Sequence, residues 1–120
     1  MNTTPKRGDI FWAELPEPVG AEPGYRRPVV IVSANSFNRS LIKTVLAVVV
    51  TTNLRLARAP GNLYLAASES GLQSDCVINV SQLLTLDKRF LTERVGPLPM
   101  NMEQSLAESL KLVLALDNPI

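Results

Sequence analysis

The 120-residue sequence has no histidine and only one cysteine, Cys76. Without histidine, neither a Ser-His nor a Cys-His catalytic pair can form. A single cysteine excludes an intramolecular disulfide and a multi-cysteine metal site. Because Cys76 lies in the apolar stretch "CVINV", the sequence favours a small core residue over a nucleophile at this position. Any catalysis must therefore come from other groups.

Long apolar runs are also missing. The longest strictly apolar run, Val45–Val50, is far shorter than the roughly 20 residues of a membrane-spanning helix. Residues 1–9 are polar, and they lack the pattern of a basic and then apolar signal segment. We therefore expect a soluble, unexported protein located in the cytoplasm.

Aromatic residues make up only 5% of the chain. This content does not support an RNA-binding surface of the kind that stacks several bases on aromatic rings. Core packing is accordingly the expected role of Trp12. The apolar fraction of 46% predicts a modest core within one domain of residues 1–120, which association with a second copy would help to stabilise.

Charge is distributed unevenly, although the net charge is only +1. Residues 1–60 contain eight Lys or Arg and four acidic residues, a balance of +4, whereas residues 61–120 contain four and seven, a balance of −3. This division could create a basic face that attracts a phosphate chain. Scattered solubilising charges are the alternative on charge alone.

The local patterns predict many short strands and one helix. The stretches "GDIFWAEL", "PVVIVS", "TVLAVVV", "NLYLAA", "CVINV" and "ERVGPL" have the alternation, β-branched content or flanking turns of strands. The Pro- and Gly-rich stretch 16–25 predicts a loop, and "NSFNRS" predicts a turn or short helix. Asn101, with Gln104 at capping-box spacing, predicts the cap of an amphipathic helix over residues 102–116 that "DNP" ends. Because strands do not alternate with helices, we expect a mainly β (α+β) fold, a small antiparallel barrel or half-barrel with a C-terminal helix.

The stretch "GYRRPVVIVS" places Arg26 and Arg27 at the start of an apolar strand. Pro28 biases Arg27 toward extended geometry, and the planar guanidinium group of arginine matches phosphate oxygens in bidentate fashion. Arg27 is therefore a candidate phosphate ligand. A surface ion pair with an acidic residue of the preceding loop, such as Glu22, is the alternative.

Two polar segments, Thr51–Asn53 and Asn79–Gln82, lie next to apolar strands. Their hydroxyl and amide groups could bind a ligand, or they could satisfy backbone groups at the strand ends. Farther along the chain, Asp87 is expected to cap a short helical turn containing "KRFL".

Taken in order, these elements resemble the MazF/PemK family of toxin endoribonucleases. The resemblance covers about Arg7 to Leu116 and rests on "RGDIFWAEL", "GAEPGYRRPVVIVS", "VTTN", "TLDKRFL" and "VGPL". It implies an SH3-like antiparallel barrel, a homodimer, and an mRNA interferase that cuts single-stranded RNA at short sequences without a metal ion or other cofactor. It also implies a partner, a small acidic MazE-like antitoxin whose disordered tail occupies the RNA groove.

The resemblance further implies a reaction in which the 2′-OH of the RNA is the nucleophile, leaving a 2′,3′-cyclic phosphate and a 5′-OH. Arg27 and Thr51 match the functional arginine and threonine of the family, and both would contact the scissile phosphate. Glu22 matches a family glutamate that would act as a base or orient Arg27. The remaining candidates for RNA binding are Arg26, Ser33, Asn35, Thr52, Asn53, Asn79 and Gln82.

One departure limits this comparison. Many family members have an Asp-Gln pair followed two residues later by arginine, where this chain has Ser81, Gln82 and Leu84. A mechanism that needs that aspartate or arginine is therefore not expected here. The alternatives are a non-catalytic CcdB-like toxin that binds DNA gyrase and an inactive RNA-binding relative. The pair Arg27 and Thr51, which a gyrase binder does not need, favours the nuclease.

Overall fold

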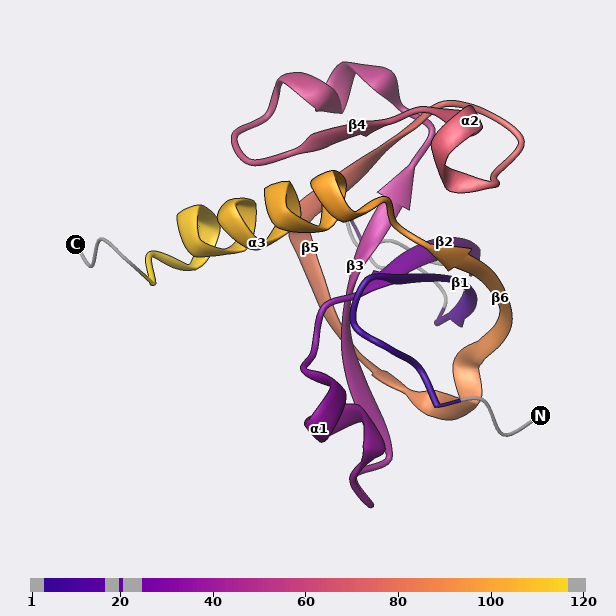
Figure 1. Cartoon of the computed structure of the whole chain (residues 1–120). Coiled ribbons are helices and arrows are strands. Elements are labelled where there is room, and N and C mark those ends of the chain that lie inside the picture. Colours follow the sequence, from indigo (N-terminus) through magenta and orange to yellow (C-terminus); the bar gives the residue numbers. More distant parts are fainter. Residues whose placement is uncertain (1–3, 17–19, 21–24, 117–120) are drawn as a thin grey trace.

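A computed structural model of the chain describes residues 4–16, 20 and 25–116. In this part of the chain, six strands form one antiparallel sheet that curls into a half-barrel (Figure 1). The strands are β1 (Asp9–Leu15), β2 (Tyr25–Ile31), β3 (Thr44–Thr51), β4 (Leu63–Leu65), β5 (Cys76–Asp87) and β6 (Leu91–Pro97). Their order across the sheet is β4-β5-β3-β2-β1-β6. The predicted mainly β fold class is therefore confirmed.

Short helical segments connect the strands, and one longer helix packs on the sheet. They are α1 (Asn35–Arg39), η1 (Leu54–Arg58), α2 (Ala67–Ser70), η2 (Lys88–Phe90) and α3 (Met100–Leu114), where η marks a 3₁₀ turn. The predicted cap of η2 is confirmed, because the Asp87 side chain accepts a hydrogen bond from the Arg89 backbone N–H at 2.9 Å. None of the described helices has the length and apolar character required to cross a membrane.

The sheet buries apolar side chains on both faces, because successive residues of a strand point to opposite sides. On the face covered by α3, the strands contribute residues such as Ile10, Val30 and Val48, and Leu106 and Leu110 of the helix pack against them. The opposite face holds a second cluster of buried residues: Phe11, Ala13, Leu15, Val29, Ile31, Val45, Ala47, Val49 and Leu86. The alternation predicted for β1 is thus confirmed.

The boundaries of α3 differ from the prediction. The helix begins at Met100 and ends at Leu114, instead of covering residues 102–116. Pro99 occupies the cap position, where its missing N–H costs nothing. Asn101 therefore lies inside the first turn and its side chain does not cap the helix. The end comes before "DNP", because Ala115 adopts the left-handed conformation with a φ of 55°.

Strand β5 is longer than the predicted stretch "CVINV" and contains an irregularity. Val48 of β3 pairs with Leu83, whereas the next residue, Val49, pairs with Asn79. The segment 80–82 of β5 therefore has no partner in β3. Such a bulge bends a strand and changes the direction of its side chains. It divides β5 into two parts, which explains why the sequence pattern revealed only the first of them.

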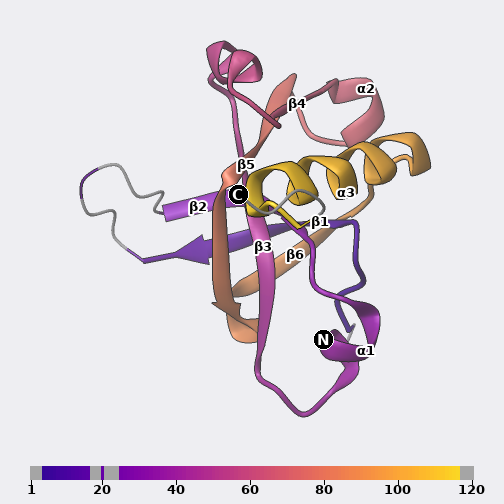
Figure 2. The ribbon, with the colours of Figure 1, turned by 90° about the vertical axis from the view of Figure 1, so that its left-hand side faces the viewer.

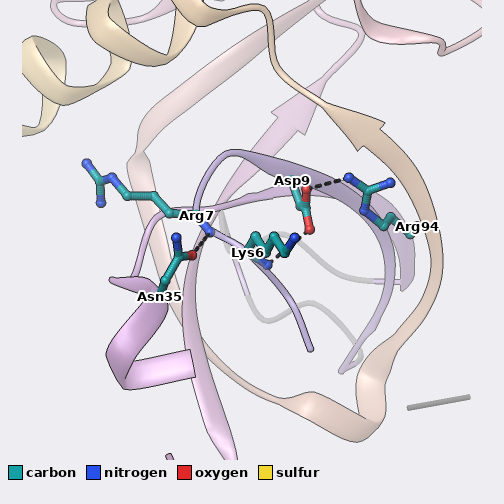
Figure 3. A network of polar contacts seen from close by, with 5 residues as sticks. All are labelled: Lys6, Arg7, Asp9, Asn35 and Arg94. Atoms are coloured by element: carbon teal, nitrogen blue, oxygen red, sulfur yellow. Dashed lines mark hydrogen bonds and ion pairs between the residues drawn. The ribbon is translucent and has the colours of Figure 1, made fainter. Parts of the chain in front are cut away.

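A partly buried ion pair fixes the start of β1 against β6 (Figure 3). Arg94 donates from Nη2 to Oδ1 of Asp9 at 2.9 Å, and the backbone N–H of Lys6 donates to Oδ2 of Asp9 at 3.0 Å. The side chain of Asp9 is 3% exposed and that of Arg94 is 37% exposed. The hydrogen bond to Asp9 raises the pKa of the Arg94 guanidinium above its usual value. The N-terminal strand is thereby held between β2 and β6.

Candidate active site

Arg27 and Thr51 lie at the same level of the sheet on neighbouring strands. Val29 of β2 pairs with Val49 of β3. Extending this antiparallel register by two residues places Arg27 of β2 opposite Thr51 of β3. Both residues are half-buried, and both line a cavity of about 290 Å³. The fold thus brings together the two residues that the sequence analysis identified as candidates for catalysis.

The cavity is formed where β1, β2, β3 and the start of β5 meet the segment that follows α2. Figure 2 shows the end of β1 beside the start of β2. The residues that line the cavity are Trp12, Arg26, Arg27, Pro28, Val50, Thr51, Thr52, Leu72, Gln73, Ser74 and Cys76. Two cations, three hydroxyl groups and an amide therefore border a partly apolar cavity, which suits a polar, negatively charged ligand.

Arg26 is held by two contacts at the edge of this cavity. Its guanidinium carbon lies 4.2 Å from the centre of the Trp12 ring, and its Nη2 lies 3.2 Å from Oε1 of Glu93 on β6. Trp12 is half-buried and lines the cavity, so the prediction that it packs in the core is wrong. It shares a face with the core residue Ile10, but at its position the sheet is covered by the arginine and not by α3.

Thr52 lines the cavity together with Thr51, whereas Asn53 does not belong to the lining. The side chain of Asn53 accepts a hydrogen bond from the backbone N–H of Arg55 at 3.2 Å and so caps η1. Its own backbone N–H donates to Oγ1 of Thr51, also at 3.2 Å. Asn53 therefore shapes the turn that follows Thr51.

Ser33 and Asn35 lie away from the cavity. Ser33 is 6% exposed, and its hydroxyl oxygen accepts a hydrogen bond from the Leu46 N–H at 3.1 Å and also contacts the buried amide of Asn38. Asn35, at the start of α1, accepts a hydrogen bond from the Arg7 backbone N–H at 2.7 Å (Figure 3). Both side chains thus join parts of the fold, and the structure does not bring them to Arg27.

Asn79 and Gln82 take part in a network at the bulge of β5. Asn79 donates to Gln82 at 3.0 Å and accepts from Asn62 and Ser81, each at 3.1 Å. The oxygen of Asn62 accepts from the N–H of Val80 at 3.0 Å. Because Asn79 is only 7% exposed, these bonds satisfy its amide group within the protein. Neither Asn79 nor Gln82 lines the cavity.

Three residues of the cavity, Leu72, Gln73 and Ser74, were not among the predicted site residues. They follow α2 in a segment that the sequence indicates only as a polar turn, and their approach to Arg27 depends on how β5 pairs with β3. A search for amides near turn glycines, such as Gln73 after Gly71, would have found one of them. Glu22, the third predicted catalytic residue, lies outside the described residues.

Cys76 lines the cavity but is unsuited to nucleophilic attack. It is 2% exposed, and burial, followed by the negative charge of Asp75, raises the pKa of its thiol to about 11. At neutral pH the thiol is therefore protonated. In the described ranges, no group of three or more Cys, Asp or Glu side chains is placed to hold a metal ion.

One known protein family matches nearly the whole chain. A family described as the PemK-like, MazF-like toxin of type II toxin-antitoxin systems matches residues 6–114. The chain belongs to this family. Among curated proteins, it is 41% identical over 110 residues to Endoribonuclease MazF6 of Mycobacterium tuberculosis (strain ATCC 25618 / H37Rv). This alignment covers 92% of this chain and 96% of that protein. It is 33% identical over 111 residues to Endoribonuclease EndoA of Bacillus subtilis (strain 168), covering 92% and 95%.

Solved structures of PemK/MazF proteins share the fold. An endoribonuclease from a mycobacterial species in complex with its cognate antitoxin superposes with a TM-score of 0.77 at 26% identity, covering 96% of this chain and 99% of that one. MazF from Deinococcus radiodurans also gives a TM-score of 0.77, at 23% identity and with coverage of 95% and 99%. The half-barrel with its C-terminal helix is thus the architecture of this family.

Proposed function

We propose that the protein is a toxin endoribonuclease that cuts single-stranded RNA at a short specific sequence. The observation that carries this proposal is that Arg27 of β2 and Thr51 of the neighbouring strand β3 line the same cavity. A cation and a hydroxyl in this arrangement suit a phosphodiester. The names of its relatives, which are endoribonucleases, support the same function.

The proposed reaction is attack by the 2′-OH of the RNA on its own phosphodiester. The 2′-oxygen forms a bond to phosphorus, the bond to the 5′-oxygen breaks, and the products are a 2′,3′-cyclic phosphate and a 5′-OH. The protein must stabilise extra negative charge on the phosphorus oxygens and assist two proton transfers. Since the RNA supplies the nucleophile, a chain without histidine and with a protonated cysteine can support this reaction, and it requires no metal ion.

Arg27 would stabilise the charge that develops on the phosphoryl oxygens. A guanidinium group provides a fixed positive charge and is a poor proton donor. Thr51 would donate its hydroxyl hydrogen to a phosphoryl oxygen. Glu22, matched to the family glutamate, would act as the base or orient Arg27. Arg26 and Thr52, which also line the cavity, would bind the RNA near the cut.

We also propose a homodimer in the cytoplasm that a small acidic MazE-like antitoxin neutralises. The support for a dimer is the exposed apolar surface at the end of α3, where Leu112, Leu114 and Leu116 are 63%, 47% and 64% exposed. Surfaces of this kind commonly mediate association. An acidic antitoxin would complement the excess of basic residues in the first half of the chain.

The test is incubation of the purified protein with a long mixed-sequence RNA in EDTA, followed by mapping of the cut positions and their end groups. We expect discrete cuts with cyclic-phosphate ends. Arg27→Ala and Thr51→Val should each lower kcat by about 10²- to 10³-fold, because each removes a donor to the charged phosphoryl group. The matched controls are Arg89→Ala and Thr85→Val, at exposed positions away from the cavity. Full activity of both site variants would refute the assignment.

A further inference from the structure

Arg26 presents a flat, charged surface at the edge of the candidate active site. The guanidinium lies over the Trp12 ring at 4.2 Å, within the range of a cation–π contact. Its Nη2 is fixed by Glu93 at 3.2 Å. The side chain of Arg26 nevertheless remains 45% exposed and lines the cavity with Arg27. One face of the guanidinium is therefore used by the indole, and the group stays accessible from the cavity.

A nucleobase is the ligand that such a surface fits. Proteins that recognise single-stranded RNA stack unpaired bases on aromatic rings and on the planes of arginine guanidinium groups. A guanidinium that already rests on an indole has lost most of its side-chain freedom, so little further ordering is needed when a base stacks on it. The low aromatic content of the chain is no obstacle, because one arginine plane supported by one ring is sufficient.

Arg26 and Arg27 are neighbours on β2, and both line the cavity. Consecutive residues of a strand project to opposite faces: Arg26 shares a face with Trp12, and Arg27 lies on the other face, opposite Ala13. The base and the phosphate of a nucleotide are attached to different carbons of the ribose, so they can contact two different side chains. An RNA strand that crosses the end of β2 can therefore place a phosphate at Arg27 and a neighbouring base at Arg26.

We infer that the guanidinium plane of Arg26, supported by Trp12 and held by Glu93, stacks on a nucleobase that flanks the scissile phosphate. This inference rests on the proposed function and adds a binding residue to it. Trp12 and Glu93 are positioning residues in this arrangement, because they act through Arg26. Arg26 contributes through its shape as well as its charge.

The chain contains a matched control. Arg89 lies 5.7 Å from the Phe90 ring and 3.1 Å from Oδ1 of Asp87, so it also combines an aromatic ring with an acidic partner. It lines a different cavity, of about 680 Å³, together with Ser40 and its neighbours up to Lys43. Arg89→Lys therefore makes the same chemical change as Arg26→Lys away from Arg27 and Thr51.

The experiment uses a short RNA containing one mapped cleavage site, and two versions in which the base on either side of the cut is absent. Arg26→Lys keeps the charge but loses the planar group. We expect it to lower kcat/KM on the intact RNA by roughly fivefold to a hundredfold, the range for loss of one base stack. One of the two abasic RNAs lacks the base that stacks on Arg26. On this RNA the variant and the wild type should have equal kcat/KM. Arg89→Lys should match the wild type on all three RNAs.

Equal losses on all three RNAs, or no loss on any, would overturn the inference. Fluorescence provides a second measurement, because Trp12 is the single tryptophan of the chain. Binding of an intact RNA with a 2′-deoxy sugar at the cut should change the Trp12 emission, and binding of the matching abasic RNA should not. An identical change with both RNAs would contradict stacking at Arg26. Failure of the proposed function would look different, since no RNA would then be cleaved by the wild type.

Discussion

Removing either partner of the ion pair between Asp9 and Arg94 should destabilise the fold, but by different amounts. At 2.9 Å the gross Coulomb attraction is about 6 kcal/mol for an effective dielectric constant of 20. The desolvation of Asp9, whose side chain is 3% exposed, offsets much of this attraction. Arg94→Gln removes the attraction and leaves a desolvated carboxylate that still accepts the hydrogen bond from the Lys6 N–H. The expected loss in the free energy of unfolding is about 3 kcal/mol.

Asp9→Asn should cost much less, although it removes the other half of the same pair. The amide oxygen of asparagine can still accept the hydrogen bond from the Lys6 N–H, and no buried charge remains. Arg94 is 37% exposed and can be hydrated after the loss of its partner. The expected loss is about 1 kcal/mol. The double variant Asp9→Asn/Arg94→Gln should therefore be more stable than Arg94→Gln alone.

These free energies can be measured by urea unfolding at pH 7, with far-UV circular dichroism as the signal. Arg89→Gln serves as the control, because its ion pair with Asp87 is exposed on the arginine side and should hardly move the urea midpoint. Equal losses for Asp9→Asn and Arg94→Gln, or a double variant less stable than Arg94→Gln, would refute the reasoning from burial.

Three further predictions concern single positions. At pH 8, the thiol of Cys76, with its pKa of about 11, should react with a disulfide reagent roughly a hundredfold more slowly than in urea, and equal rates would contradict its burial. Hydrogen bonds from Arg89 hold the pKa of Asp87 below its usual value, so its contribution to stability is present above about pH 4 and lost as the pH falls through the lower folded-state pKa. The difference in urea midpoint between wild type and Asp87→Ala should shrink accordingly in acid. Gly8→Ala should cost about 1–2 kcal/mol in thermal unfolding, because Gly8 has a φ of 90° and an added Cβ would lie 2.9 Å from Oε2 of Glu103.

Much of the fold could be predicted, because the strands follow local patterns. Alternation in β1, β-branched runs in β2 and β3, and the turn capped by Asp87 are each visible within a few residues. The features that were missed depend on contacts between distant segments. The second half of β5 is separated from the first by a bulge, and α3 begins earlier because Pro99 occupies the cap in place of Asn101.

The candidate site was predictable to a similar extent. Arg27 and Thr51 were identified from their positions next to apolar strands and from the family resemblance, and the register of β2 and β3 brings them together. The polar residues Ser33 and Asn79 have the same chemistry, but the fold uses them for internal hydrogen bonds. Residue type alone cannot show whether a polar side chain faces the cavity or is buried in internal hydrogen bonds. The prediction for Trp12 failed for the same reason, because residue type does not show how deeply the ring is buried.

The topology of the sheet also bears on how the protein is made in the cell. The cavity takes residues from β1 to the start of β5, and β1 completes its pairing only with β6, close to the end of the chain. Because synthesis proceeds from the N-terminus, a growing chain that has not yet released β6 lacks the second of the two partners of its first strand. Glu93, which holds Arg26 at the edge of the cavity, also lies on β6, so the surroundings of the cavity are complete only after β6 has been synthesised and has paired.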